Sequence, residues 1–144
     1  MRLLSVQLSN GGSAVLTVTG YSMMPMLHDR RDSVTLIPVN GQEHKGDIVL
    51  YKRENGAYVL HRIIAENQEG FVCCGDNQYM REPVHRQQLI AKVTSFVYKG
   101  KELSVENKTY KVYVALWVGL FPLRGVYIPV RRFLGKIIRK FASK

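Results

Sequence analysis

Three polar side chains in the sequence are of the types that together hydrolyse a peptide bond. Ser22 lies in "TGYSMMPML", just after a strand-like run and a glycine. A serine hydroxyl is a poor nucleophile unless a base takes its proton. His61, in "YVLHRII", is a candidate base, and Asp76, in "CCGDNQ", is a candidate acid to orient an imidazole. These residues make a hydrolytic site only if the fold brings them together.

Each of the three also has a purely structural interpretation. A serine or an aspartate beside a glycine commonly caps backbone groups in a turn. A histidine in mid-strand is either a satisfied core residue or a base placed at a site. His61 has apolar neighbours, whereas the remaining histidines lie in turns or polar stretches: His28, His44 and His85. Both interpretations stay open at this level.

The residues around Ser22 favour a shaped loop. Irregular backbone past a strand can leave the N–H of Ser22 free to point at a substrate oxygen, as an oxyanion hole requires. Met23, like the other apolar residues that follow, would anchor the loop in the core or face a substrate side chain. Pro25 restricts the backbone freedom of the same loop.

Short β-branched runs separated by turns must position these residues. An Asn55–Gly56 pair between two such runs favours a tight hairpin. Strands of this length and spacing are typical of an all-β sheet or barrel. The runs that we interpret as strands are residues 14–19, 33–39, 47–53, 57–66, 71–75 and 89–100, with 101–107 as a partner for the last.

The C-terminal part of the chain differs from this β body. The whole chain has a net charge of +10. Residues 124–144 hold seven of its 21 basic residues and no acid. Pro129 suits a helix start. One helical stripe after it is apolar: Val130, Phe133, Leu134, Ile137, Ile138 and Phe141. We therefore expect a β domain over residues 1–107 and an apolar and basic helical tail over residues 108–144.

This tail has two interpretations. As a basic amphipathic helix, residues 112–141 would lie in a membrane interface, making the protein peripherally membrane-associated and otherwise cytoplasmic. Alternatively, the apolar side of this helix packs on the protein's own β body or on a second copy. A spanning helix is disfavoured, since the uncharged run 112–123 is shorter than the ~20 residues required.

Several other classes of function are disfavoured by the sequence. The two cysteines, Cys73 and Cys74, are adjacent, which suits neither a disulfide nor a thiolate metal site. No metal-ligand spacing or phosphate-binding loop is evident, so we expect no metal and no cofactor. The basic tail has no docking motif for nucleic acid, and we expect no specific nucleic-acid partner.

Four short segments in order resemble the signal peptidase I family and the wider S24/S26 group that it shares with LexA-like self-cleaving proteins. They are "GYSMMPML", "GDIVLYKR", "YVLHRI" and "GDN", and the resemblance covers residues 14–98. It implies a mainly β fold with a coiled sheet, with Ser22 as the nucleophile. It places the base at His61, where many bacterial members have lysine, so the chain looks like the histidine-type variant.

The sequence departs from the family pattern at three places. Histidine-type members carry a further aspartate after the "GDN" segment, but here that stretch offers Glu82, so both Asp76 and Glu82 are candidate acids. Gly20 stands where many signal peptidases have a serine that assists the oxyanion hole, which would leave backbone N–H groups to form it. Membrane signal peptidases usually have an N-terminal transmembrane anchor, and none is evident.

The function that these observations favour is a serine endopeptidase that cleaves a signal or leader peptide with a Ser22/His61 dyad. One alternative is a degenerate peptidase fold that holds an extended peptide by β-augmentation without cleaving it. Another is LexA-like self-cleavage, which needs a long cleavable N-terminal segment, whereas 21 residues precede Ser22.

Overall fold

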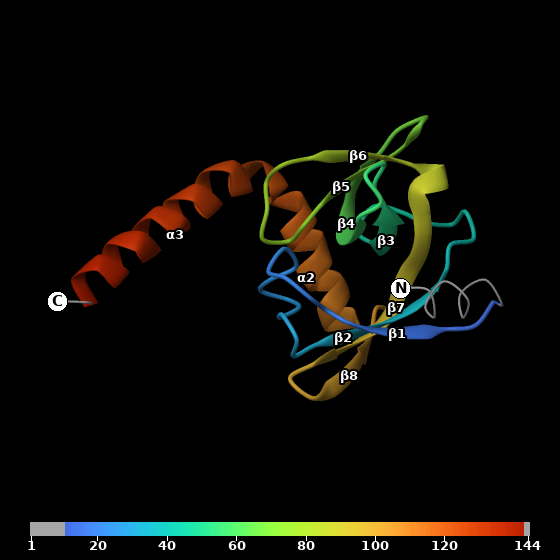
Figure 1. Cartoon of the computed structure of the whole chain (residues 1–144), viewed down its shortest axis with the longest axis horizontal. Helices are drawn as coiled ribbons and strands as arrows, with labels where there is room; N and C mark the ends of the chain where they lie inside the picture. Colours follow the sequence, from blue (N-terminus) through green and yellow to red (C-terminus); the bar gives the residue numbers. More distant parts are fainter. Residues whose placement is uncertain (1–10, 143–144) are drawn as a thin grey trace.

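The computed structural model describes residues 11–142, which fold into a mainly β body followed by two helices (Figure 1). The helices are α2, Lys108–Gly119, and α3, Phe121–Ala142. A short 3-10 turn, η1, spans Arg86–Gln88. The eight strands of the described chain are β1 Ala14–Thr17, β2 Ser33–Pro38, β3 Ile48–Lys52, β4 Tyr58–Glu66, β5 Gly70–Cys74, β6 Glu82–His85, β7 Leu89–Tyr98 and β8 Lys101–Ser104.

All eight strands belong to one antiparallel sheet with the order β1-β2-β7-β3-β4-β5-β6. Strand β7 is its centre, because β2 pairs along one edge while β3 and β8 share the other. The register shifts in β2, β3 and β4, next to Thr35, Leu50 and Ile63. Such bulges bend strands and increase their twist, so the sheet curls instead of lying flat.

The curled sheet buries side chains on both faces. In β3, Ile48 and Leu50 enter one apolar cluster, and the alternate residues Val49 and Tyr51 enter another. The first cluster also includes residues of the loop after β1, of β7 and of α2, and the second joins β3 to β4, β5 and β6. Strand β3 is therefore buried on both sides and is a rigid support for the strand beside it.

One strand lies outside the segments interpreted as strands in the sequence. Strand β6 contains Pro83, and a proline argues against strand structure unless the strand lies at an edge. Here β6 pairs with β5 alone and forms the end of the sheet, so the missing N–H of Pro83 is tolerated.

The helical segment begins earlier than its amphipathic pattern indicates. Asn107 caps α2, since its side-chain oxygen accepts the N–H groups of Thr109 and Tyr110 at 2.9 and 3.2 Å. Tyr110 is buried in the first apolar cluster, so α2 shares the core of the β body. The prediction that Pro129 starts the last helix is wrong: α3 begins at Phe121, and Pro129 lies inside it.

Helix α3 leaves the β body after its first turns and extends away from it (Figure 1). Its buried residues are near its start, at Phe121, Arg124 and Ile128. Within residues 11–142 no single helix is long and apolar enough to cross a membrane. Helices α2 and α3 taken together pass by length and composition, but the pair is bent by 83°.

Candidate active site

The loop after β1 holds Ser22 in a fixed turn. Gly20 adopts a φ of +88°, a left-handed conformation that strains other residues, and its N–H donates to Asp29 Oδ1 at 2.7 Å. Met23 is buried in the first apolar cluster and anchors the loop there, whereas Pro25 is exposed. A serine at position 20 would be strained, which gives a structural reason for the glycine.

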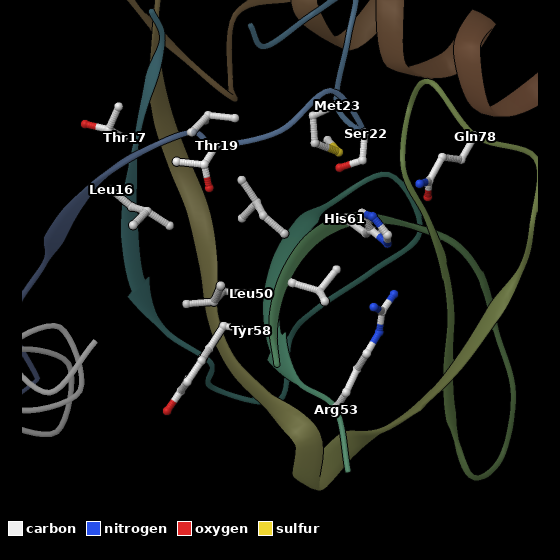
Figure 2. A pocket seen from close by; sticks show the side chains of 13 residues that line it. Leu16, Thr17, Thr19, Ser22, Met23, Leu50, Arg53, Tyr58, His61 and Gln78 are labelled. Atoms are coloured by element: carbon white, nitrogen blue, oxygen red, sulfur yellow. The ribbon is translucent and has the colours of Figure 1, made fainter. Parts of the chain in front are cut away.

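Ser22 and His61 line the same cleft, which has a volume of about 310 Å³ (Figure 2). Ser22 comes from the loop after β1, and His61 comes from β4, where it pairs with Val49 of β3. The side chain of His61 is almost fully buried, at 4% exposure. The two side chains make no hydrogen bond with each other within the described chain, and catalytic hydrogen bonds are often long before substrate binds.

The hydroxyl of Tyr51 fixes the tautomer of His61. This hydroxyl donates a hydrogen bond to Glu82 Oε2 at 2.7 Å, and its oxygen lies 3.1 Å from His61 Nδ1. A phenol has one proton to donate, so the second contact requires Nδ1–H of His61 to donate to the phenol oxygen. The imidazole therefore carries its proton on Nδ1 and has a lone pair on Nε2, as a general base requires.

Glu82 is the carboxylate nearest to this imidazole, with Oε2 3.9 Å from His61 Nδ1. Arg53 donates to both of its oxygens at 2.6 Å. These hydrogen bonds lower the pKa of Glu82 below its usual range, so the group is a carboxylate at neutral pH. Burial, reinforced by Glu82, raises the pKa of Tyr51, which stays a phenol.

Burial lowers the pKa of His61 to about 4, an effect that the nearby Glu82 carboxylate opposes and the Arg53 guanidinium reinforces. At neutral pH the imidazole is thus uncharged and able to accept a proton. Tyr51 and Arg53 were not among the residues singled out in the sequence. They lie two positions apart on the strand of the "GDIVLYKR" segment, where alternation puts them on one face.

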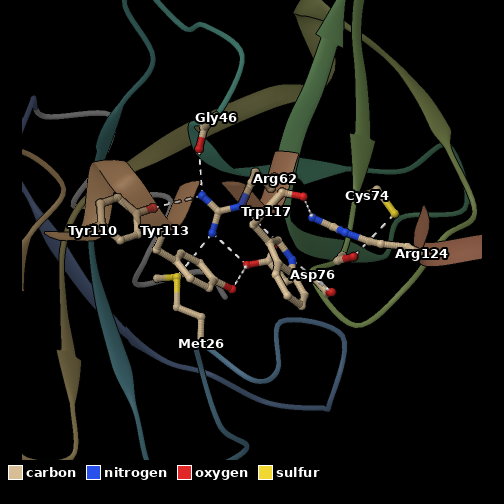
Figure 3. Close-up of polar contacts among 10 residues, drawn as sticks. Met26, Gly46, Arg62, Cys74, Asp76, Tyr110, Tyr113, Trp117 and Arg124 are labelled. Carbon is tan, nitrogen blue, oxygen red and sulfur yellow. Dashed lines mark hydrogen bonds and ion pairs between the residues drawn. The ribbon is translucent and has the colours of Figure 1, made fainter. Parts of the chain in front are cut away.

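Asp76 lies in a different environment, turned away from His61. It is fully buried and accepts two hydrogen bonds from Arg62, at 2.8 and 2.7 Å (Figure 3). Burial alone would lower the pKa of Arg62, but the Asp76 charge offsets this and raises it. Arg62 follows His61 in β4, so their side chains point to opposite faces of the sheet. The acid that reaches the histidine is Glu82, and Asp76 belongs to an interior ion pair.

Arg62 links this ion pair to the loop of Ser22 and to α2. Its guanidinium also donates to Gly46 O at 2.8 Å, to the Tyr110 hydroxyl at 3.0 Å and to Met26 Sδ at 3.2 Å (Figure 3). Tyr110 belongs to α2 and Met26 belongs to the loop after β1. All of the charged donors are therefore used inside the protein, which indicates a structural role for the pair.

The "GDN" segment supports the backbone of Ser22 directly. The N–H of Asn77 donates to the Ser22 carbonyl oxygen at 2.7 Å, and its side-chain amide donates to Tyr21 O at 3.1 Å. A Cβ at Gly75 would lie 2.6 Å from the same Ser22 oxygen, so only glycine fits there without a shift. The segment thus acts on the site through the position of Ser22.

The remaining geometry suits acyl transfer. Within residues 11–142 the N–H groups of Ser22 and Met23 donate to no backbone carbonyl, so both are available to donate to an oxyanion. No group of three or more histidine, cysteine, aspartate or glutamate side chains that could hold a metal occurs in that part of the chain. Protein-family models, curated proteins and solved structures were each compared with the chain, and none matches it.

Proposed function

We propose that this protein is a serine endopeptidase of the signal-peptidase type, which cleaves a signal or leader peptide. The observation that carries the proposal is the arrangement of Ser22 and His61 on one cleft, with the imidazole kept neutral by its burial and oriented by the hydroxyl of Tyr51. The curled sheet is compatible with the coiled β-sheet that the four sequence segments imply.

The reaction uses each of these groups in turn. Ser22 Oγ attacks the peptide carbonyl carbon while His61 Nε2 takes the hydroxyl proton, and the carbonyl oxygen becomes an oxyanion that accepts from backbone N–H groups. His61 then gives that proton to the leaving amine, which releases the first product and leaves an acyl-serine. A water molecule, deprotonated by the same imidazole, hydrolyses the ester and restores Ser22.

The charge that develops on His61 is stabilised through Tyr51. The imidazolium Nδ1–H donates to the phenol oxygen, which donates in turn to the Glu82 carboxylate. A hydrogen-bond chain of this kind lets the negative charge of Glu82 favour the protonated imidazole while Glu82 itself stays ionised. Arg53 holds the carboxylate in place.

The cleft offers both apolar and polar contacts to an extended peptide. Its walls include Leu16, Leu50 and Leu60, and Leu16 and Thr17 belong to β1. Strand β1 pairs with β2 alone within the described sheet, so its other edge can pair with a peptide strand. In this proposal, a signal or leader peptide binds as an added strand along β1.

Fluorophosphonate labelling tests the proposal. The wild-type chain should gain one covalent adduct on Ser22, located by mass spectrometry of its peptides. His61→Ala should label much more slowly, Ser22→Ala should not label, and the exposed Ser13→Ala should label like the wild type. Labelling that persists in Ser22→Ala would count against the dyad, and so would a complete absence of labelling in the wild type.

A non-catalytic peptide-binding module is the second candidate. It is favoured by the lack of a Ser22–His61 hydrogen bond in the described chain. Peptide cleavage followed by mass spectrometry separates the two, because a binding module retains peptides without producing fragments. The intact mass of the chain during the same incubation tests LexA-like self-cleavage.

A further inference from the structure

The two faces of helix α3 have opposite surroundings. One face contacts the body through the buried residues Phe121, Arg124 and Ile128. Further along, Arg131 donates to Asn77 Oδ1 at 3.0 Å and Arg132 donates to Asn77 O at 3.2 Å. The opposite face is apolar, and its side chains are exposed, so the β body of the described chain does not cover it.

This uncovered face forms one continuous stripe. Its residues recur at helical spacing, which places them on one side of α3. Phe133 is 64% exposed and Phe141 is 75% exposed. Soluble monomers rarely expose apolar surface of this extent, and such patches mark docking surfaces. We define the apolar stripe as Leu123, Val126, Val130, Phe133, Ile137 and Phe141, all of which are exposed.

The charge of the helices selects the partner. No aspartate or glutamate follows Glu106, so both α2 and α3 lack acidic residues. The basic residues of α3 lie off the stripe, and a second copy of the chain would bring an equally basic helix against them. Like charges brought together across an interface oppose association, whereas an anionic surface attracts them. The basic residues of α3 beyond its buried start are Arg131, Arg132, Lys136, Arg139 and Lys140.

Helix α2 extends the apolar surface. Val112 and Leu116 of α2 recur every four residues with Leu120, the C-cap of that helix, and each is more than half exposed. The 83° bend between α2 and α3 prevents the two helices from forming one straight span. An apolar surface of this shape lies along an interface instead of crossing it.

We propose that α3 docks this protein on an anionic lipid surface, with the apolar stripe inserted at the boundary of head groups and acyl chains. The basic side chains then lie at the level of the phosphates, where their aliphatic stems can stay in apolar surroundings. This inference rests on α2 and α3 and does not depend on any peptidase activity.

Vesicle co-sedimentation of the full chain tests the docking. Vesicles of phosphatidylglycerol mixed with phosphatidylcholine should bind the protein, and vesicles of phosphatidylcholine alone should bind it much more weakly. Phe133→Gln with Phe141→Gln removes two stripe residues, and Met80→Gln is the matched control, since Met80 is an exposed apolar residue of the body. Glutamine is a good helix former, and circular dichroism checks that α3 persists.

A second pair of variants tests the charge. Lys136→Gln with Arg139→Gln should weaken binding to the anionic vesicles on the order of ten- to thirty-fold, since each basic side chain near such a surface contributes roughly fivefold. Lys45→Gln with Lys101→Gln removes two exposed basic residues of the body and should have little effect.

Three results would overturn the proposal. The first is no binding to either kind of vesicle. The second is equal loss of binding in the helix variants and their controls. The third is a concentration-dependent dimer in sedimentation velocity that Phe133→Gln with Phe141→Gln abolishes while lipid binding is absent, because the stripe would then bind a second copy.

Discussion

The hydroxyl oxygen of Tyr51 lies 3.1 Å from His61 Nδ1, and the same hydroxyl donates a hydrogen bond to Glu82. The phenol therefore separates the base from the acid that supports it, in place of direct contact between carboxylate and imidazole. The buried phenol also keeps that side of the imidazole away from water. In the proposed enzyme, Tyr51 would be a positioning residue that acts through His61.

Replacing Tyr51 with phenylalanine tests this role. Tyr51→Phe leaves the Nδ1 proton of His61 without its acceptor and separates the imidazolium from Glu82. We expect kcat to fall on the order of 10²- to 10⁴-fold with KM nearly unchanged, since general acid–base catalysis contributes roughly that factor. Tyr58→Phe is the control, because Tyr58 lines the same cleft. A wild-type kcat in Tyr51→Phe would rule out the relay, and nitrogen NMR of the imidazole would report the tautomer independently.

The buried His61 also predicts the pH dependence of activity. Its pKa of about 4 means that protonation removes the base only well below the ordinary value of 6.5. The acid limb of the kcat/KM profile is therefore expected below pH 6.5, with little change between pH 6.5 and 8 from this group. An acid limb at or above pH 6.5 would show that the imidazole titrates as an exposed group.

The same pKa affects stability. The unfolded chain binds a proton at His61 near pH 6.5, whereas the folded chain binds it near pH 4. The unfolded state therefore holds more protons between these values, and the free energy of unfolding should rise with pH across that window. Urea denaturation of wild type and His61→Phe at several pH values measures this contribution, and the exposed His85→Gln should keep the wild-type slope.

Much of the β body could be predicted from the sequence because its signals are local. The Asn55–Gly56 pair lies between β3 and β4, and strands from β1 to β8 fall on or within the predicted segments, with β6 as the exception. Strand β6 is stabilised by pairing with β5 and not by its own composition. Helix α2 lies within the predicted helical tail, but its packing into the β body was not predicted, since Tyr110 is held by a core that forms from distant strands.

The choice between Asp76 and Glu82 could not be made from sequence. It depends on which face of β4 each acid contacts. His61 and Arg62 are adjacent in that strand, so their side chains lie on opposite faces. The pairing of Asp76 with Arg62 and of Glu82 with Arg53 brings together residues 14 and 29 positions apart. No local sequence pattern predicts such long-range contacts. The spacing of Tyr51 and Arg53 does predict that their side chains lie on the same face of a strand.

Replacing each of two buried arginines should affect the free energy of unfolding differently. Arg62→Met leaves the Asp76 carboxylate buried and unpaired, which should cost about 3–5 kcal/mol in the free energy of unfolding. Arg124 is buried beside Trp117, and two of its nitrogens have no hydrogen-bond partner within the described chain. Arg124→Met should therefore be neutral or stabilising, because the side chain's charged form is poorly compensated. Urea denaturation of both variants measures the contrast, and equal destabilisation would contradict it.

Gly75 provides a test of how the "GDN" segment acts on Ser22. In Gly75→Ala the new Cβ would start 2.6 Å from the Ser22 carbonyl oxygen, so the nucleophile turn must shift. A displacement of about 1 Å can cost on the order of 10²-fold in rate, and we expect a loss of that size in kcat with a smaller effect on KM. Gly125→Ala in α3 is the matched control, since nothing lies within 4 Å of the added Cβ, and it should keep full activity. Fluorophosphonate labelling rates and thermal unfolding, measured together, separate a displaced Ser22 from an unfolded protein. If Gly75→Ala labels at the wild-type rate, the close contact between Gly75 and Ser22 does not set the position of the hydroxyl, and the support assigned to this segment is wrong.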